Sequence, residues 1–345
     1  MAGRGFGWVG RRIEERTFHY VRVAIIGCGL IGQKRAKALA GATLVVCCDL
    51  KLELAEKLAA AYPGVRATAD WREVVAAEDV DIVVVATIHK ELAPIAAAAA
   101  GAGKHVLVEK PGARRAAELD PVLEAAARTG VRVRVGFNHR YHPAMQKARE
   151  ILDSGVAGPL MFIRGRYGHG GGPGYDKNWR AVEDLSGGGE AIDQGMHLID
   201  LSRWYMGDFP NVQGQIATYF WDMPVEDNVF LLLQTAAGQT AQLHATWTEW
   251  KNLFSLEIYG KYGKIDISGL GRSYGVEKLT YYQMAPDLLP PSKVEFEYPG
   301  EDLSWELEFA AFLTDIREGR DPEPGVRDAQ AALRIVEAIY KENGR

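Results

Sequence analysis

The chain has 345 residues, a length that predicts two domains with substantial apolar cores. Its 40 Lys and Arg against 45 Asp and Glu give a net charge of −5, which argues against nucleic acid or an anionic membrane surface as a partner. With 47% hydrophobic and 25% charged residues, the composition is that of a globular protein and excludes general disorder.

The cysteines and the N-terminus bear on the compartment. The 3 cysteines include the neighbours Cys47 and Cys48 and form neither a disulfide framework nor a metal-ligand spacing, which predicts a reducing cytoplasm and no metal site. Residues 1–20 mix arginines and acids without an apolar core, so we interpret them as an extension rather than a signal peptide. No run of apolar residues is long enough to predict a membrane span.

From Val21 onward, short β-branched runs alternate with stretches rich in Ala and Leu. The predicted strands are 21–26, 43–48, 81–86, 105–109 and 131–137, and the predicted helices are 31–40, 52–61, 91–102 and 116–129. A further short helix is expected after Asp70, which with Glu73 has the spacing of a capping box. This alternation predicts that residues 21–137 form a doubly wound α/β domain of the Rossmann type, with a parallel sheet.

After residue 137 the pattern changes to strands separated by turns. The predicted helices are 143–154, 190–205, 303–318 and 326–342, and the predicted strands are 159–167, 212–220, 228–235, 239–247, 253–260, 263–268 and 278–284. Period-two alternation predicts an α+β domain over 138–345 with a large, mostly antiparallel open sheet. The open face favours a homodimer or homotetramer formed through that sheet, and the last two helices are candidates to pack back on the first domain.

The segment GCGLIG has the setting of a dinucleotide-binding loop. Gly27, Gly29 and Gly32 follow the first strand and precede a helix, where glycines allow a tight turn, close approach of a pyrophosphate and close helix packing. Asp49 ends the second strand, where its carboxylate can accept the hydroxyls of a ribose. It would repel a 2′-phosphate about 4 Å away by roughly 4 kcal/mol, so we expect NAD rather than NADP.

Three further residues suggest acid–base chemistry. Lys110 follows the strand 105–109, at the sheet edge where ligands of doubly wound folds bind. Asp193 and His197 are four apart, which predicts one helix face, either as a catalytic pair or as an exposed pair after a glycine hinge. Oxidation of an alcohol needs a base and a nearby cation, so His197 oriented by Asp193 could be the base with Lys110 as the cation, or Lys110 could be the base. Asp200 is expected to pack or cap.

Taken together, GCGLIG, the strand-end EKP, GFNHRYHP and GGG…DQGMHLID resemble the glucose-fructose oxidoreductase, inositol dehydrogenase and rhizopine-catabolism (Gfo/Idh/MocA) family from Val21 to the C-terminus. The resemblance implies hydride transfer between a secondary hydroxyl of a sugar or polyol and the nicotinamide, with Lys110, Asp193 and His197 as the catalytic triad. It also implies cofactor contacts beyond the glycines, Asp49 and Lys110, at Leu30, Ile31, Thr87, Ile88, His89, Glu109, Asn138, Trp179 and Arg180. The N-terminal extension departs from the family pattern but disturbs no motif.

The segment 164–180, RGRYGHGGGPGYDKNWR, is basic, glycine-rich and aromatic, which predicts recognition of an anionic group such as a diphosphate. The alternative is a solvated or subunit-facing sheet surface. The expected substrate contacts are Lys110, Arg140, Tyr141, Arg164, Arg166, Tyr167, Tyr175, Lys177, Asp193 and His197.

The resemblance extends to family members that oxidise the 3-hydroxyl of a nucleotide-linked amino sugar such as UDP-N-acetylglucosamine, and this is the expected reaction. A free sugar or inositol dehydrogenase is the alternative. An NAD-dependent glycosidase and a non-catalytic NAD(P)-sensing protein of the same fold are further alternatives.

Overall fold

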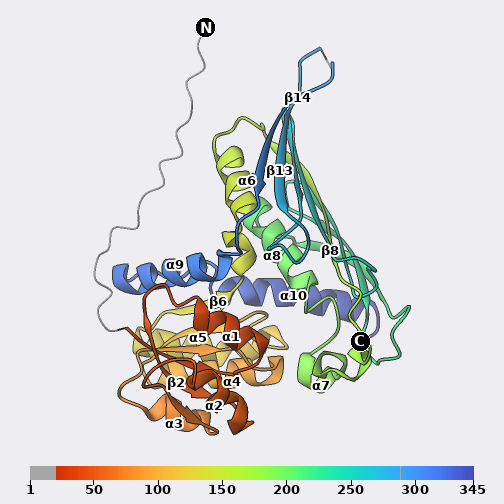
Figure 1. Ribbon diagram of the computed structural model, residues 1–345. Coiled ribbons are helices and arrows are strands. Elements are labelled where there is room, and N and C mark those ends of the chain that lie inside the picture. Colours follow the sequence, from red (N-terminus) through yellow and green to blue (C-terminus); the bar gives the residue numbers. More distant parts are fainter. Residues whose placement is uncertain (1–20, 288) are drawn as a thin grey trace.

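The first domain contains a six-stranded parallel sheet in the order β3-β2-β1-β4-β5-β6 (Figure 1). The structure, a computed structural model, describes residues 21–287 and 289–345, so the predicted extension 1–20 lies outside the described residues. The strands are β1 (Arg22–Ile26), β2 (Thr43–Cys48), β3 (Arg66–Thr68), β4 (Ile82–Val85), β5 (His105–Glu109) and β6 (Val133–Gly136). The chain reverses its strand order between β1 and β4, and ligands of such folds bind at this point of the sheet.

Helices cover both faces of this sheet. They are α1 (Leu30–Lys37), α2 (Leu52–Ala59), α3 (Trp71–Ala76), α4 (His89–Gly101) and α5 (Asp120–Thr129). Along β4, Val83 and Val85 belong to one apolar core and Ile82 and Val84 to another, because successive side chains point to opposite faces. The predicted doubly wound α/β fold is confirmed.

The short helix α3 begins where it was predicted, but the capping box does not form. The Asp70 side chain accepts a hydrogen bond from the Arg72 N–H at 3.0 Å. The Glu73 carboxylate instead accepts a hydrogen bond from the Thr68 hydroxyl at 2.5 Å, so it does not reach back to the cap. One side-chain cap is therefore enough to start this helix.

The second sheet has eight strands in the order β14-β13-β12-β11-β7-β10-β9-β8. They are β7 (Leu160–Gly168), β8 (Asn211–Ala217), β9 (Asn228–Gln234), β10 (Thr240–Thr246), β11 (Leu253–Gly260), β12 (Gly263–Ser268), β13 (Glu277–Gln283) and β14 (Ser292–Tyr298). Within this second sheet, β7 and β10 are the only described strands that pair in parallel, so the predicted mostly antiparallel sheet is confirmed. Strand β14 was not predicted. It lies at the sheet edge, where charged residues alternate with Phe296 and Tyr298, which are only partly buried.

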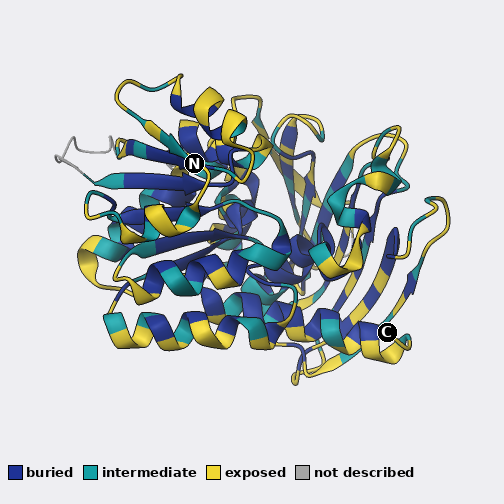
Figure 2. Ribbon diagram, turned by 90° about the horizontal axis from the view of Figure 1, so that it is seen from below, coloured by how far each residue is buried: buried dark blue, intermediate teal, exposed yellow. Residues whose placement is uncertain are grey.

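Helices α6 (Pro143–Asp153), α8 (Gly195–Met206) and α10 (Val326–Glu342) pack against one face of the large sheet. Buried and exposed residues alternate along its strands, as Figure 2 shows. In β11, for example, Phe254, Leu256 and Ile258 are buried while the residues between them are partly exposed. The sheet therefore has one core face and one open face.

Helix α9 (Ser304–Glu318) returns to the first domain, where Phe309, Phe312 and Leu313 join the core on one face of the parallel sheet. Arg35 of α1 is fully buried and donates hydrogen bonds to Glu109 and to Glu308, each at 2.6 Å. These contacts fix the strand end that carries Lys110. No helix within 21–287 and 289–345 has both the length and the apolar character that spanning a membrane requires.

Candidate active site

A cleft of about 1110 Å³ opens at the carboxyl ends of the parallel strands and is lined by residues of both domains. Most of the predicted site residues meet there. They are Gly27, Gly29, Leu30, Ile31, Asp49, Thr87, Ile88, His89, Glu109, Lys110, Asn138, Tyr167, Tyr175, Trp179, Arg180, Asp193 and His197.

The three glycines of the loop after β1 have different structural roles. Gly27 has φ +97°, and a Cβ there would lie 2.3 Å from the Ala86 carbonyl oxygen. A Cβ at Gly32 would lie 1.9 Å from the Gly27 carbonyl oxygen, so Gly32 lets α1 pack against the turn but does not itself line the cleft. A Cβ at Gly29 would meet no atom within 4 Å, which leaves the cleft open for a ligand to approach the backbone.

Asp49 follows β2 and holds a fixed carboxylate at one end of the cleft. Its two oxygens accept hydrogen bonds from the backbone N–H groups of Cys28, at 2.8 Å, and Lys51, at 2.9 Å. The start of α1, the open approach at Gly29 and this carboxylate fit the pyrophosphate and the ribose of a dinucleotide. The residues present therefore fit NAD.

At the other end of the cleft, Asp193 is held by two cations. The Lys110 Nζ lies 2.5 Å from Asp193 Oδ1 and 3.0 Å from its backbone oxygen, and Arg180 Nε lies 2.9 Å from Oδ2. Burial by itself would raise the pKa of Asp193, but the charges of Lys110 and Arg180 hold that pKa well below its ordinary value. Asp193 is therefore a carboxylate that orients both cations.

The predicted pairing of Asp193 with His197 on one helix face is wrong. Helix α8 begins at Gly195, and residues 190–194, predicted to be helical, form turns in which the Gly195 N–H donates to the Glu190 carbonyl. The Asp193 side chain points to Lys110 and Arg180 because two charged partners stabilise it more than one neutral imidazole.

The His197 ring lines the cleft and is held by packing. It stacks on the His139 ring, with centroids 3.6 Å apart and 17° between the planes. Its Nδ1 atom is buried and has no hydrogen-bond partner in the described part of the chain. Burial, followed by the charge of Lys110, holds the pKa of His197 well below its ordinary value, so the ring is neutral.

His89, another predicted cofactor contact, is also a neutral, buried ring. Its Nδ1 lies 2.7 Å from the Ser186 carbonyl oxygen, and the Trp179 ring meets it edge-on at 4.8 Å. Burial, followed by the charge of Lys110, lowers the pKa of His89 to about 3. His89 therefore connects the start of α4 to the segment that carries Trp179 and Arg180.

A set of cleft residues was missed by the sequence analysis. His139 Nε2 lies 3.2 Å from the Tyr167 hydroxyl, and Gln194 Nε2 donates to the Tyr274 hydroxyl at 2.8 Å. His139 could have been identified from the sequence, because it follows Asn138 at the end of a predicted parallel strand, where ligands bind. The others lie mostly on connections in the second domain, where nothing local marks them. The missed residues nearest the catalytic end include His139, His142, His169, Gln194, Asn252, Leu270, Gly271, Ser273, Tyr274, Asp302 and Trp305.

Glu190 is a fully buried carboxyl group beneath this end of the cleft. Neither of its oxygens forms a well-directed hydrogen bond within the described chain, although the Gln194 backbone N–H lies close by. Burial, followed by the neighbouring Asp193 carboxylate, raises the pKa of Glu190 well above its ordinary value. The pKa of Glu190 shifts in the opposite direction to that of Asp193, because at Glu190 the effect of burial exceeds the stabilisation of the carboxylate by the charge of Lys110.

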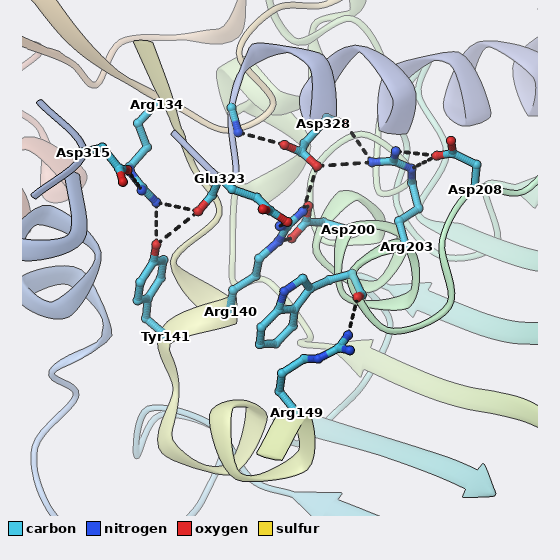
Figure 3. Close-up of polar contacts among 12 residues, drawn as sticks. Arg134, Arg140, Tyr141, Arg149, Asp200, Arg203, Asp208, Asp315, Glu323 and Asp328 are labelled. Carbon is cyan, nitrogen blue, oxygen red and sulfur yellow. Dashed lines mark hydrogen bonds and ion pairs between the residues drawn. The ribbon is translucent and has the colours of Figure 1, made fainter. Parts of the chain in front are cut away.

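Arg140 and Tyr141, predicted to contact substrate, lie outside the cleft lining in a polar network between the domains (Figure 3). Arg140 is buried and donates to both oxygens of Asp200, at 2.9 and 2.6 Å, so that Asp200 packs as expected. The Tyr141 hydroxyl accepts a hydrogen bond from Arg134 at 2.5 Å. Both predictions are corrected because these side chains already have protein partners.

Arg164, Arg166 and Lys177 also lie outside the cleft lining. Arg164 and Arg166 point to the open face of the sheet, because alternation along β7 directs Tyr167 inward and its neighbours outward. Arg164 pairs with Glu257 at 2.9 Å, and Lys177 is exposed. The predicted clamp for a diphosphate is therefore not assembled, and of its segment the cleft receives Tyr167, His169, Tyr175, Trp179 and Arg180.

Comparison with known proteins gives a consistent family. Residues 21–137 match an oxidoreductase family with an NAD-binding Rossmann fold, and residues 145–266 match the GFO/IDH/MocA C-terminal domain. Levoglucosan dehydrogenase from Pseudarthrobacter phenanthrenivorans is 27% identical over 283 residues, which cover 71% of this chain and 73% of the relative. Inositol 2-dehydrogenase from Rhizobium meliloti is 27% identical over 333 residues, which cover 93% and 96%.

Solved structures agree with these relatives. Levoglucosan dehydrogenase in complex with NADH and levoglucosan superposes with a TM-score of 0.84 at 26% identity, covering 93% of this chain and 96% of that one. GenD2 from gentamicin A biosynthesis in complex with NAD has a TM-score of 0.81 at 25% identity, covering 100% and 98%. The chain belongs to the Gfo/Idh/MocA family of oxidoreductases and carries its NAD-binding Rossmann domain.

Proposed function

We propose that this NAD-dependent oxidoreductase oxidises a secondary hydroxyl of a free sugar or polyol ring. The observation that carries the proposal is that Lys110, held by Asp193 at 2.5 Å, and the neutral His197 line the same cleft as Gly29 and Asp49. When bound, NAD accepts the hydride that leaves the carbon atom. The residues of the chain must then remove the hydroxyl proton and exclude water.

Lys110 is the better base of the two candidates. If His197 took the proton, its ring would carry a buried Nδ1–H without a partner and a positive charge beside Lys110. As a neutral ring with its proton on Nε2, it can instead donate a hydrogen bond to the substrate oxygen. To act as the base, the Lys110 ammonium first releases its proton to solvent. Its amine then takes the hydroxyl proton, and Asp193 stabilises the ammonium that forms again. The alcohol thereby loses one proton and one hydride and becomes a carbonyl.

A free ring is favoured over a nucleotide-linked sugar. The expectation of a UDP-N-acetyl amino sugar depended on a basic clamp whose Arg164, Arg166 and Lys177 lie outside the cleft lining. At the catalytic end of the cleft, the two cations Lys110 and Arg180 already share Asp193, and their neighbours are tyrosine, tryptophan, histidine and amide side chains suited to hydroxyl groups. Two of the relatives described above are named as dehydrogenases of levoglucosan and of inositol.

The test is a substrate panel with NAD, in which absorbance of the reduced nicotinamide is measured. The panel contains levoglucosan, myo-inositol, free hexoses and UDP-N-acetylglucosamine. We expect turnover with at least one uncharged ring and weaker turnover with the nucleotide sugar. If UDP-N-acetylglucosamine is the best substrate, the nucleotide-sugar alternative replaces this proposal.

We also propose that copies of the chain associate through the open face of the large sheet. That face carries two stacked pairs, Phe162 with Tyr259 and Phe230 with His244, each with ring centroids 4.2 Å apart. Analytical ultracentrifugation should report a dimer or tetramer, and Phe230→Glu should shift it toward the monomer. A monomeric native protein would contradict this proposal. The cytoplasmic location stays a prediction.

A further inference from the structure

A group of exposed aromatic rings lies beside the substrate end of the cleft. We call Phe220, Trp221 and Trp250 the aromatic platform. Phe220 is 53% exposed and Trp250 is 78% exposed, and the Phe220 ring lies 5.2 Å from Trp221 and 5.0 Å from Trp250. Large apolar rings that adjoin one another at the surface mark a binding site more often than scattered ones do.

The platform is continuous with the cleft. The Trp221 ring lies 5.7 Å from the ring of Tyr175, which lines the cleft, and Asn252, which also lines it, follows Trp250 by two residues. Gly171, with φ +67°, lies between the two rings, since a Cβ there would be 2.9 Å from both Trp221 and Tyr175. Any larger residue at this position would separate the platform from the cleft.

Buried polar contacts fix the segment of the platform that carries Phe220 and Trp221. The carboxylate of Asp227, which is fully buried, accepts hydrogen bonds from the backbone N–H groups of Tyr219, Phe220 and Trp221 at 2.9, 2.8 and 3.0 Å. The Trp221 indole N–H donates to the Trp247 carbonyl at 3.0 Å. The Trp221 ring and the backbone of Phe220 are therefore held in place before any ligand binds, which lowers the entropy cost of binding.

We propose that the platform binds the outer part of an extended substrate, namely a second sugar ring joined by a glycosidic bond to the ring oxidised at Lys110. The C–H faces of a pyranose ring are apolar and pack on aromatic rings, while its hydroxyl groups remain in water. This inference rests on the proposed function and specifies its substrate class as glycosides larger than one ring. The first ring would occupy the space between Tyr175 and Lys110.

The experiment measures binding, so that it does not depend on turnover. Isothermal titration calorimetry of the protein with bound NADH uses myo-inositol and its galactoside galactinol, and glucose with cellobiose and maltose. We expect at least one disaccharide to bind about tenfold more tightly than its single ring, and Trp250→Ala and Phe220→Ala each to remove most of that gain. Tyr262→Ala, which removes an exposed ring at the turn between β11 and β12, is the matched control and should retain it.

Two results would overturn the proposal. One is equal affinity of the native protein for single rings and disaccharides. The other is a change in sedimentation of Trp250→Ala and Phe220→Ala with unchanged affinities, because the platform would then be a contact between copies of this chain. Failure of the proposed function is a separate result, in which no sugar of the panel reduces NAD even though binding is measured.

Discussion

The rings of His139 and His197 stack face to face, with centroids 3.6 Å apart. His139 is in turn fixed by Tyr167 and Asn138, each 3.2 Å from one of its ring nitrogens. Packing on His139 therefore orients His197. From the sequence, this role was predicted for the carboxylate of Asp193. Asp193 pairs with Lys110 and Arg180 rather than with His197, and this supports the proposed role of Lys110 as the base.

The first prediction separates the two candidate bases. Lys110→Met should lower kcat/KM by 100-fold or more, the usual contribution of a general base, while NADH still binds in fluorescence titration. His197→Gln keeps a hydrogen-bond donor and should lower kcat/KM by about 10-fold, as expected for the weakening of one hydrogen bond. If His197→Gln loses 100-fold or more while Lys110→Met loses only about 10-fold, His197 rather than Lys110 takes the proton.

The second prediction concerns cofactor choice. Asp49→Ser should raise the ratio of kcat/KM with NADP to that with NAD by about 100-fold or more, because it removes a carboxylate that would repel a 2′-phosphate by several kcal/mol. Asp70→Ser, which alters an exposed acid at the start of α3, serves as the control and should leave the ratio unchanged. A native enzyme that already prefers NADP would contradict the role given to Asp49.

The third prediction compares arginines inside and outside the cleft. Arg180→Ala should lower kcat/KM by about 10-fold, because Asp193 loses one of its two cations and Lys110 is held less firmly. Arg164→Ala should change KM less than about twofold, since Arg164 faces the open side of the sheet and pairs with Glu257. Steady-state kinetics on the best substrate of the panel test both. A large rise in KM for Arg164→Ala would restore the anionic clamp.

The fourth prediction is a loss of stability in mild acid. Burial lowers the pKa of His139 well below its ordinary 6.5, so below that pH the unfolded chain binds a proton that the folded one does not. As pH falls from 6.5, the free energy of unfolding should therefore decrease by up to about 1.4 kcal/mol per pH unit for this group.

Urea denaturation between pH 7 and pH 5 measures this effect. His139→Phe keeps a stacked ring that cannot titrate, so its stability should fall less steeply with decreasing pH than that of the native protein. Parallel slopes for His139→Phe and the native protein would show that His139 is not buried as a neutral ring.

The fifth prediction concerns Glu190, for which the sign is opposite. The pKa of Glu190 is raised in the folded protein, so the unfolded chain loses its proton first as pH rises above about 4.5. The native protein should thus lose stability with rising pH through this group. Glu190→Gln should be more stable than the native protein at pH 8, and the difference should shrink toward pH 4.5. Thermal unfolding at both pH values measures this difference. If Glu190→Gln is less stable than the native protein at pH 8, the negative charge of Glu190 stabilises the fold and the prediction is wrong.

Local sequence patterns predicted five of the six strands of the first domain and missed β3, an edge strand of three residues without a fully buried side chain. The five predicted strands read as apolar runs, and the glycines after β1 have a steric role that depends only on the adjoining strand and helix. Lys110 was found for the same reason, since it follows a strand whose carboxyl end lies at the ligand edge of the sheet. In the second sheet, period-two alternation predicted seven of its strands and missed β14, an edge strand whose apolar residues are at most partly buried.

The partners of charged side chains were decided only by the tertiary structure. Asp193 is four residues from His197, yet it pairs with Lys110, which is 83 residues away, because Coulomb attraction depends on distance in space and grows when water is excluded. Arg140 and Arg164 are cations like Arg180, but Asp200 and Glu257 hold them outside the cleft lining. Local sequence patterns predicted the fold and the residue types proposed for catalysis. Long-range packing determined which of those groups line the cleft and which neutralise one another.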